Sequence, residues 1–244
     1  MYRRLLFIGA IGVFTLAAIL WTSCTDLMFA ERLNAGESSC DRACLDGLLD
    51  QYLDALAAND PVRLPVTKTV KFTEDGQRLN LGDGLWNTAT GRGTYKFYMD
   101  DVQAGQVGFF GTMREAGEPI IISLRLKIEN HKIAEIETIV VRNKGEAENL
   151  EKRGHPDPLF METIPAADRA SRAELVDTAN MYFSGMQLND GKGNYPFTDD
   201  CDRVENGMEA TNNRAADTAD AVADGGSCVR FLRTVFRTPR RLNL

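Results

Sequence analysis

The hydrophobic positions that follow residue 40 recur at helical spacing and predict one long helix. They lie one, three or four residues apart: Leu45, Leu48, Leu49, Tyr52, Leu53 and Leu56. This spacing gathers them into a single apolar stripe. The outer face is left to polar residues: Asp46, Asp50, Gln51 and Asp54. Asp41 is the expected N-cap, and Asn59-Asp60-Pro61 is the expected end, because the residue before a proline disfavours helical geometry.

Alternating β-branched and polar positions further along the chain predict strands. Residues 66–73 form the first strand, Glu74-Asp75-Gly76 is a turn, and residues 78–81 can return beside it. A loop punctuated by glycines then occupies residues 82–93, with room for a short helix. The longer strands are expected at residues 95–99, 106–113, 120–129 and 133–142.

The strand expected at residues 120–129 has the clearest alternation. Ile122 and Leu124 alternate with Ser123 and Arg125, which is typical of a half-buried antiparallel strand. The order of elements over residues 40–142 is therefore a helix, a strand pair, a loop and a meander of longer strands. Helices that are segregated from an antiparallel sheet define an α+β domain, which is the fold class we expect.

A second helical pattern in the C-terminal half repeats the spacings of the first. Seven positions lead from Tyr52 to Asn59, and seven lead from Tyr182 to Asn189. Glu205-Asn206-Gly207 then follows at nearly the same distance as the first Glu-Asp-Gly turn. An ordered set of matches of this kind predicts a diverged internal duplication.

The second copy is expected to be incomplete. A charged linker that contains prolines, residues 143–164, leads into it, and the copy itself covers residues 165–210. Residues 211–244 are low in complexity and then basic, and they do not alternate as a sheet would. They are interpreted either as a truncated or frameshifted end or as a solvated basic tail.

The N-terminus carries a targeting pattern that is separate from the fold. Arg3-Arg4 precede an uncharged apolar run over residues 5–21, which is the arrangement of a signal peptide. A cleaved signal peptide over residues 1–24 is the first interpretation, and an uncleaved signal anchor is the alternative. Residues 25–39 are a polar leader. The protein is therefore expected to be secreted, with contact to a membrane only if the N-terminal segment is retained.

The chain has five cysteines, and Cys24 lies at the edge of the targeting segment. The other four predict disulfides in an exported chain: Cys40, Cys44, Cys201 and Cys228. Cys201 and Cys228 could bond locally. Cys40 and Cys44 could bond each other if Cys40 precedes the helix, or each could reach the second half. The spacing of cysteine, histidine and aspartate matches no zinc site, so no metal is expected.

Charge and motifs exclude several classes of function. The net charge is −7, and a general nucleic-acid binder needs clustered lysine and arginine, so no nucleic-acid partner is expected. The sequence contains no nucleophile elbow, phosphate loop or dinucleotide fingerprint, and no cofactor is expected. His131 lies in a turn and His155 in the linker, and neither is placed as a catalytic base.

Four stretches carry a resemblance to a known superfamily. They are residues 40–45, Phe72-Thr73-Glu74-Asp75-Gly76, Leu81-Gly82-Asp83-Gly84-Leu85-Trp86, and Gly105 with Gly108 before Phe109-Phe110-Gly111. With the helix and the meander, they resemble the NTF2-like superfamily, which includes the SnoaL-like and ketosteroid-isomerase-like proteins, and within it an uncharacterised secreted family frequent in fungi. The resemblance implies a cone in which a curved sheet and N-terminal helices enclose an apolar pocket, and often a homodimer formed through the sheet.

The resemblance also implies candidate site residues. Tyr52 corresponds to an oxyanion donor and Glu74 to a proton shuttle, while Ser123 is the nearest match to a third donor that the isomerases carry. A packed core tyrosine and a solvated turn residue are the structural alternatives for the first two. Aromatic residues could line the pocket: Trp86, Tyr95, Phe97 and Phe109. Two hypotheses follow, a module that binds a small apolar molecule without catalysis and a cofactor-independent isomerase or cyclase that uses acid–base chemistry.

Overall fold

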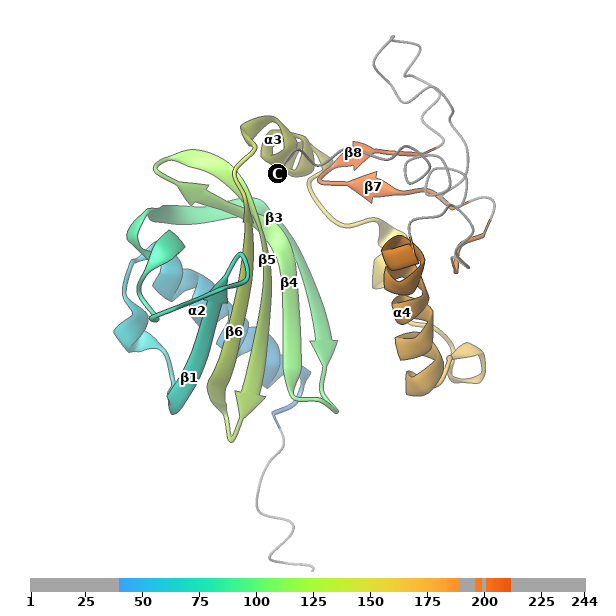
Figure 1. Ribbon diagram of the computed structural model, residues 1–244, viewed down its shortest axis with the longest axis horizontal. Coiled ribbons are helices and arrows are strands. Elements are labelled where there is room, and N and C mark those ends of the chain that lie inside the picture. Colours follow the sequence, from blue (N-terminus) through green and yellow to red (C-terminus); the bar gives the residue numbers. More distant parts are fainter. Residues whose placement is uncertain (1–39, 189–195, 199–200, 212–244) are drawn as a thin grey trace, which may run out of the picture.

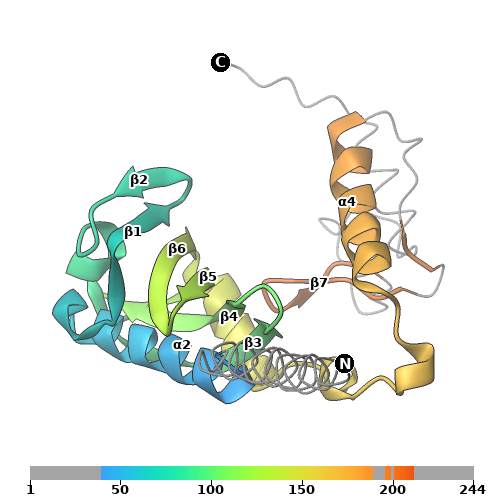
Figure 2. The same cartoon turned by 90° about the horizontal axis from the view of Figure 1, so that it is seen from below.

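A computed structural model of the chain describes residues 40–188, 196–198 and 201–211 (Figures 1 and 2). Its α-helices are α2 (Arg42–Ala57), α3 (Lys144–Arg153) and α4 (Arg172–Leu188). Its strands are β1 (Val66–Glu74), β2 (Gln77–Leu79), β3 (Ala89–Asp101), β4 (Gln106–Glu115), β5 (Glu118–Glu129), β6 (Lys132–Val141), β7 (Val204–Glu205) and β8 (Met208–Glu209). Short 3₁₀ helices are η1 (Pro61–Arg63), η2 (Gly84–Asn87), η3 (Pro158–Met161) and η4 (Ala166–Asp168). The targeting segment, the leader, Asn189-Asp190 and the tail from residue 212 lie outside the described residues.

A six-stranded curved sheet is the centre of the first domain, which confirms the α+β fold class. Its strand order is β2-β1-β6-β5-β4-β3. One pair corrects the expectation of a wholly antiparallel sheet, because β1 and β6 run parallel. A parallel pair needs a long connection, and the path through β2 to β5 provides it. The mixed sheet is therefore a consequence of closing the meander back onto the first strand.

Helix α2 crosses one face of this sheet (Figure 2) and supplies the largest share of the core. The Asp41 side chain accepts a hydrogen bond from the Cys44 N–H at 2.9 Å, which is the N-cap that the sequence predicts. The apolar stripe of the helix is buried: Leu45, Leu49, Tyr52, Leu53, Ala55 and Leu56. This side of the sheet is called the α2 face below.

The end of α2 is fixed by Asn59, whose φ is 53°. The Asp60 N–H donates to the Ala55 carbonyl at 2.9 Å, which is the 6→1 hydrogen bond of a Schellman motif. The Asn59 amide also donates to the carbonyls of Trp86 and Ala89, at 2.7 and 2.9 Å. The Asn-Asp-Pro sequence therefore stops the helix and also joins its end to the start of β3.

Helix α3 lies inside the segment that was expected to be a linker, and this expectation is wrong for residues 144–153. The helix has few apolar residues, so its sequence pattern predicts a helix only weakly. Two of them, Ala147 and Leu150, are buried against Tyr95 and Ile121 on the other side of the sheet. This side is called the α3 face below.

Four hairpins in the described residues use two-residue loops. The loop residues all have positive φ: Asp75-Gly76, Ala116-Gly117, Asn130-His131 and Asn206-Gly207. The strand residues that flank each loop are paired with each other. Two positive φ values define the type I′ turn, whose twist matches that of the strands. The predicted turns at Asp75-Gly76 and Asn130-His131 are confirmed.

The C-terminal half has a different character in the part that the structure describes. Helix α4 stands apart from the sheet (Figures 1 and 2), and Gly185 is its one buried residue. The β7–β8 hairpin lies against α3, where a Cβ on Gly207 would be 2.5 Å from the Leu150 backbone nitrogen. None of the described helices is long and apolar enough to cross a membrane.

Candidate functional site

The aromatic residues proposed to line one pocket lie on two faces of the sheet. Trp86 and Phe109 belong to the core on the α2 face, whereas Tyr95 and Phe97 pack on the α3 face. Ser123 is exposed, and its neighbours Ile122 and Leu124 point into the α2 face. Side chains alternate between the faces of a strand, so these five residues cannot converge on one ligand. The pocket set is therefore divided by the pleat of the sheet.

Tyr52 and Glu74, in contrast, are brought into one buried cluster. The Tyr52 ring meets the Trp86 ring edge-on, with centroids 5.4 Å apart. Burial raises the pKa of Tyr52 far above its ordinary value, neighbouring Thr138 and Trp86 lower it, and the charge of Glu74 raises it further. Tyr52 is therefore a neutral phenol at any physiological pH, able to donate a hydrogen bond but not to act as a base.

Two further polar atoms of this cluster have no hydrogen-bond partner, the Trp86 Nε1 and the Thr138 Oγ1. Both are close enough to the Tyr52 hydroxyl to affect its pKa, but neither meets it with hydrogen-bond geometry. A buried polar group without a partner costs free energy, so such groups are infrequent in a core. The cluster therefore has unsatisfied hydrogen-bonding capacity inside the domain.

Glu74 is buried, with 8% of its surface exposed, and is not a solvated turn residue. One carboxylate oxygen, Oε2, accepts a hydrogen bond from the Leu85 N–H at 2.9 Å. The other, Oε1, lies 3.6 Å from an Arg142 nitrogen. Gly84 has a φ of 64°, and a Cβ there would approach Oε2 to 2.5 Å, so a larger residue would be strained and would displace the carboxylate. Both oxygens of Glu74 thus hold the start of η2 and the end of β6.

A pocket of about 240 Å³ opens between α2 and strands β3 and β4. Its lining residues are Asp50, Arg92, Gly93, Thr94, Tyr95, Lys96, Phe109, Thr112 and Met113. Phe109 and Met113 are buried core residues, whereas Asp50, Arg92 and Lys96 are polar. Tyr95 and Phe109 are the two residues of the proposed pocket set that line it. The lining is therefore mostly polar, with a charged rim formed by Asp50, Arg92 and Lys96 and with Phe109 and Met113 as its buried apolar members.

The rim is organised by Arg92, which sequence analysis did not single out. Its guanidinium bridges Asp50 at 2.5 Å and Asp54 at 3.0 Å. The Tyr98 hydroxyl donates to the same Asp50 carboxylate at 2.7 Å. The two aspartates lie on a solvent-accessible face of α2, as expected, and the tertiary structure also places them opposite Arg92 of β3. The nearest signal in the sequence was the Gly91-Arg92-Gly93 triplet, which was expected to be a loop and lies within β3.

The ionisation of the rim follows from these contacts. Burial raises the pKa of Asp50, but hydrogen bonds from Arg92 and Tyr98 outweigh it, so the pKa is lowered. Burial and the hydrogen bond to Asp50 raise the pKa of Tyr98 to about 12. The rim therefore holds a carboxylate, a guanidinium and a neutral phenol at neutral pH.

An irregularity in β3 shapes the wall of the pocket. The register between β3 and β4 shifts between Arg92 and Lys96, which interrupts the ladder. Side chains satisfy the freed backbone groups: Thr112 Oγ1 accepts from the Tyr95 N–H, and Glu151 of α3 accepts from the Thr94 N–H, both at 3.2 Å. A β-bulge of this kind re-aims side chains and is frequent beside sites. Helix α3 thus holds the irregularity in place from behind.

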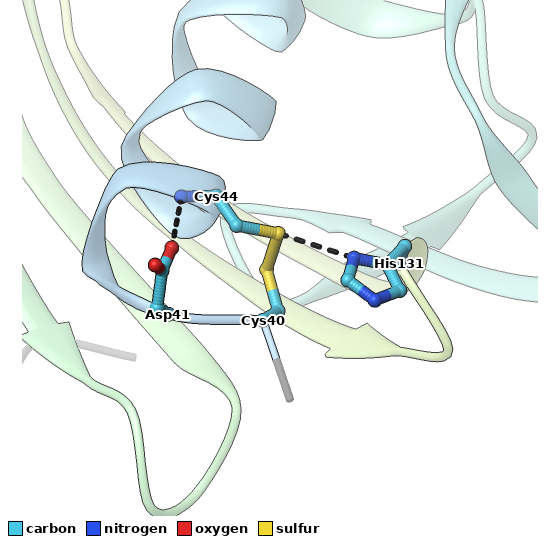
Figure 3. The surroundings of a disulfide bond; sticks show 4 residues. All are labelled: Cys40, Asp41, Cys44 and His131. Atoms are coloured by element: carbon cyan, nitrogen blue, oxygen red, sulfur yellow. Dashed lines mark hydrogen bonds between the residues drawn. A yellow bond between two sulfur atoms is a disulfide. The ribbon is translucent and has the colours of Figure 1, made fainter. Parts of the chain in front are cut away.

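A second group of chemical interest lies at the start of α2 (Figure 3). Cys40 and Cys44 form a disulfide, and their Cα atoms are 5.2 Å apart. Cys40 precedes the first residue of the helix, which decides between the pairings that the sequence left open. The Nδ1 of His131 lies 3.3 Å from the Cys44 sulfur. Cys201 is also disulfide-bonded, and Cys228, the partner considered for it, lies outside the described residues.

The chain was compared with family models, curated proteins and solved structures. A family model described as a domain of unknown function (DUF8021) matches residues 168–243, which is less than half of the chain. No curated protein matches the chain.

Solved structures similar to the chain include NTF2-like and ketosteroid-isomerase-like proteins. An NTF2-like protein of unknown function from Cytophaga hutchinsonii is 10% identical, covers 38% of this chain and 86% of its own, and has a TM-score of 0.31. A candidate ketosteroid isomerase from Kribbella flavida is 12% identical, with coverages of 55% and 100% and a TM-score of 0.36. AclR, a candidate hydroxylase from Streptomyces galilaeus, is 12% identical, with coverages of 59% and 99% and a TM-score of 0.34. These values carry no argument about activity.

Proposed function

We propose that the chain is an exported protein whose NTF2-like domain binds a small, largely apolar molecule in the pocket between α2, β3 and β4, without catalysis. The observation that carries this proposal is that two buried apolar side chains, Phe109 and Met113, border a pocket whose lining is otherwise mostly polar and structured. Ligand pockets generally combine an apolar lining with a few placed polar groups.

The size and charge of the pocket narrow the ligand. Its volume of about 240 Å³ is below the range for drug-sized ligands, roughly 300–1,000 Å³. The charge of Arg92 is balanced by Asp50 and Asp54, so the rim suits a neutral polar group better than an anion. We therefore expect a compact apolar molecule that carries a carbonyl or a hydroxyl group.

Ligand-induced thermal shifts across a panel of small lipids and polyketides test this function. Arg92→Ala should weaken binding of any hit roughly tenfold or more, because it removes a charged hydrogen-bonding group from the rim. Arg125→Ala is a matched control, since Arg125 also bridges two carboxylates, Glu135 and Glu137, but from β5. Equal losses in the two variants, or no shift with any apolar ligand, would contradict the proposal.

An acid–base enzyme that uses Tyr52 and Glu74 is the second candidate, an isomerase or a cyclase. It is favoured by one observation, that both side chains share a buried cluster with two unpartnered polar atoms. The contacts of both Glu74 oxygens count against it. Deuterium exchange at the carbon beside the carbonyl of a bound ketone, followed by NMR, tests it. Exchange that is lost in Tyr52→Phe and in Glu74→Gln would favour the enzyme, and no exchange in the parent protein would exclude this mechanism.

Two further parts of the proposal concern assembly and location. Exposed apolar side chains on the outer side of the sheet, such as Ile139 and Met99, support a homodimer formed through the sheet. Light scattering after size exclusion should then give a dimer in the parent and a monomer in Ile139→Asp. Mass spectrometry of the protein from the culture medium tests export and cleavage of the N-terminal segment, and an intact segment in a membrane fraction would support the anchored form.

A further inference from the structure

The hairpin that joins β5 and β6 differs from the other described two-residue hairpins. In three of the four, the second loop residue is glycine: Gly76, Gly117 and Gly207. The β5–β6 loop has His131 at this position, with φ of 58°. A non-glycine residue in the left-handed region is strained, and such strain is typical of functional positions. The position therefore keeps an imidazole where the turn itself favours glycine.

This imidazole faces the Cys40–Cys44 disulfide at the start of α2. The ligand atoms of Cys40, Cys44 and His131 all lie within 4.8 Å of one another. Figure 3 shows the His131 ring directed at the Cys44 sulfur, which lies 3.3 Å from Nδ1. The cysteines are partly buried and His131 is exposed, so solvent and small ions can reach the group.

We propose that Cys40, Cys44 and His131 form a redox-gated metal site, which is a disulfide when oxidised and binds one thiophilic ion such as Zn²⁺ when reduced. Two thiolates and one imidazole are a ligand set that zinc accepts, and three protein ligands leave a fourth position open to water. The sequence separation of 87 positions from Cys44 to His131 explains why the spacing of the sequence shows no zinc motif.

The two states exclude each other because a sulfur in a disulfide has no thiolate to offer. Reduction by a dithiol transfers two electrons and two protons to the Cys40–Cys44 bond, and the dithiol becomes a disulfide. Binding of Zn²⁺ then releases the two thiol protons and uses the lone pair of the neutral imidazole. In an oxidising compartment the disulfide is the resting form, and the metal form requires a reductant.

Cobalt titration of the full chain tests the site, with Cys24, Cys201 and Cys228 each replaced by serine so that one pair of sulfurs remains. After reduction with a phosphine, which does not compete for metal as a dithiol does, we expect one Co²⁺ per chain, a thiolate-to-cobalt charge-transfer band, and displacement by Zn²⁺. The oxidised protein should show no band. A reduced protein without the band would overturn the proposal.

His131→Gly is the decisive variant, because it restores the residue that the three other hairpins use and should leave the turn intact. We expect its affinity for Co²⁺ to fall at least tenfold while its thermal stability is kept. Unchanged affinity in this variant would show that the imidazole is not a ligand and would overturn the three-residue site. Cys44→Ser should abolish the charge-transfer band at stoichiometric metal, and a band that persists there would also overturn it.

Discussion

Each half of the chain contains a helix followed by a hairpin with a two-residue loop, but the helix is buried in the first half and largely exposed in the second. In the first, a helix that carries Tyr52 leads to a hairpin closed by Asp75-Gly76; in the second, a helix that carries Tyr182 leads to one closed by Asn206-Gly207. Both hairpins have two positive φ values in the loop. Tyr52 is 1% exposed in the core, whereas most of the apolar side chains of α4 are exposed, with Phe183 at 62%.

This difference shows that the formation of a helix or a hairpin does not by itself determine whether its side chains are buried. The spacing of the residues forms the helix and the hairpin in both halves, because caps and turn residues act over a few positions. Burial requires a partner surface, and among the described helices the long strands β3 to β6 supply it for α2 and α3 but not for α4. The resemblance of the halves is thus a resemblance of sequence and turns, and duplication stays a hypothesis.

The largest contrast should appear in core truncations. Leu49→Ala in α2 should lower the free energy of unfolding by about 2–5 kcal/mol, because Leu49 is fully buried and leaves a cavity. Leu175→Ala in α4 should change it by less than about 0.5 kcal/mol, because Leu175 is 60% exposed. Urea denaturation followed by fluorescence measures both. A comparable loss from Leu175→Ala would show that α4 is covered in solution.

The two glutamates that precede the hairpin loops should also differ. Glu74→Gln should cost about 1–3 kcal/mol, because the buried carboxylate holds the Leu85 N–H and faces Arg142. Glu205 forms an ion pair with Arg203 at a more exposed place, and Glu205→Gln should cost less than about 1 kcal/mol. Thermal unfolding of the two variants under identical conditions compares them. A larger effect at Glu205 would reverse the proposed ranking of the halves.

For Gly76 and Gly207, the second residues of the two hairpin loops, the larger effect of substitution is expected in the second half of the chain. Gly76→Ala should cost about 1–2 kcal/mol from its positive φ alone, since a Cβ there meets nothing within 4 Å. Gly207→Ala adds a clash with the Leu150 backbone at 2.5 Å, so it should also detach the β7–β8 hairpin from α3. Hydrogen exchange should then speed up in the hairpin and not in the six-stranded sheet. Unchanged exchange in β7–β8 would show that this contact is not formed in solution.

The smallest expected effect is a pH-dependent change in thermal stability at Asp46, a residue of α2 that faces Asp100 of β3. Burial and the facing Asp100 raise the pKa of Asp46 above its ordinary value of 3.8, with Asp50 adding to the rise and Arg42 opposing it. A raised carboxyl pKa favours the folded state at low pH, and this contribution is lost as the pH rises through the folded value. Asp46→Asn should therefore raise Tm at pH 7 by roughly 1–3 °C and bring no gain near pH 3.

Val176 provides the matched position in α4, six residues before Tyr182 as Asp46 is before Tyr52. Its side chain is largely exposed, so Val176→Asp should titrate without changing Tm between these pH values. A gain in Asp46→Asn that is equal at pH 3 and pH 7 would show that the carboxyl pair is not responsible.

Much of the fold was predictable because it depends on short-range chemistry. The N-cap at Asp41, the stop at Asn59 and the turn at Asp75-Gly76 each involve residues within five positions of one another. Helix α3 was missed because its few apolar residues give no stripe, and it is held by Glu151 reaching a distant strand. Signals that act across the chain leave little trace in a local pattern.

In the candidate site, too, some features were predictable from the sequence and others depend on contacts between distant parts of the chain. The family resemblance implied that Tyr52 and Glu74 belong to one site, and the structure places them in one buried cluster. The sequence could not show that Trp86 packs on the α2 face and Phe97 on the α3 face, because the face of a β3 residue depends on the register shift between Arg92 and Lys96. Nor could it pair Arg92 with Asp50, since side-chain partners that are far apart in sequence meet only through the packing of α2 on β3.

By itself the sequence determined the α+β class, the ends of α2 and the type of the first hairpin. The tertiary structure decided which polar residues are buried, which faces the aromatic residues occupy, and that His131 meets the Cys40–Cys44 disulfide. The physical reason is distance along the chain. Capping and turn preferences act over a few residues, whereas burial and the meeting of functional groups depend on how strands pair and how a helix packs on them.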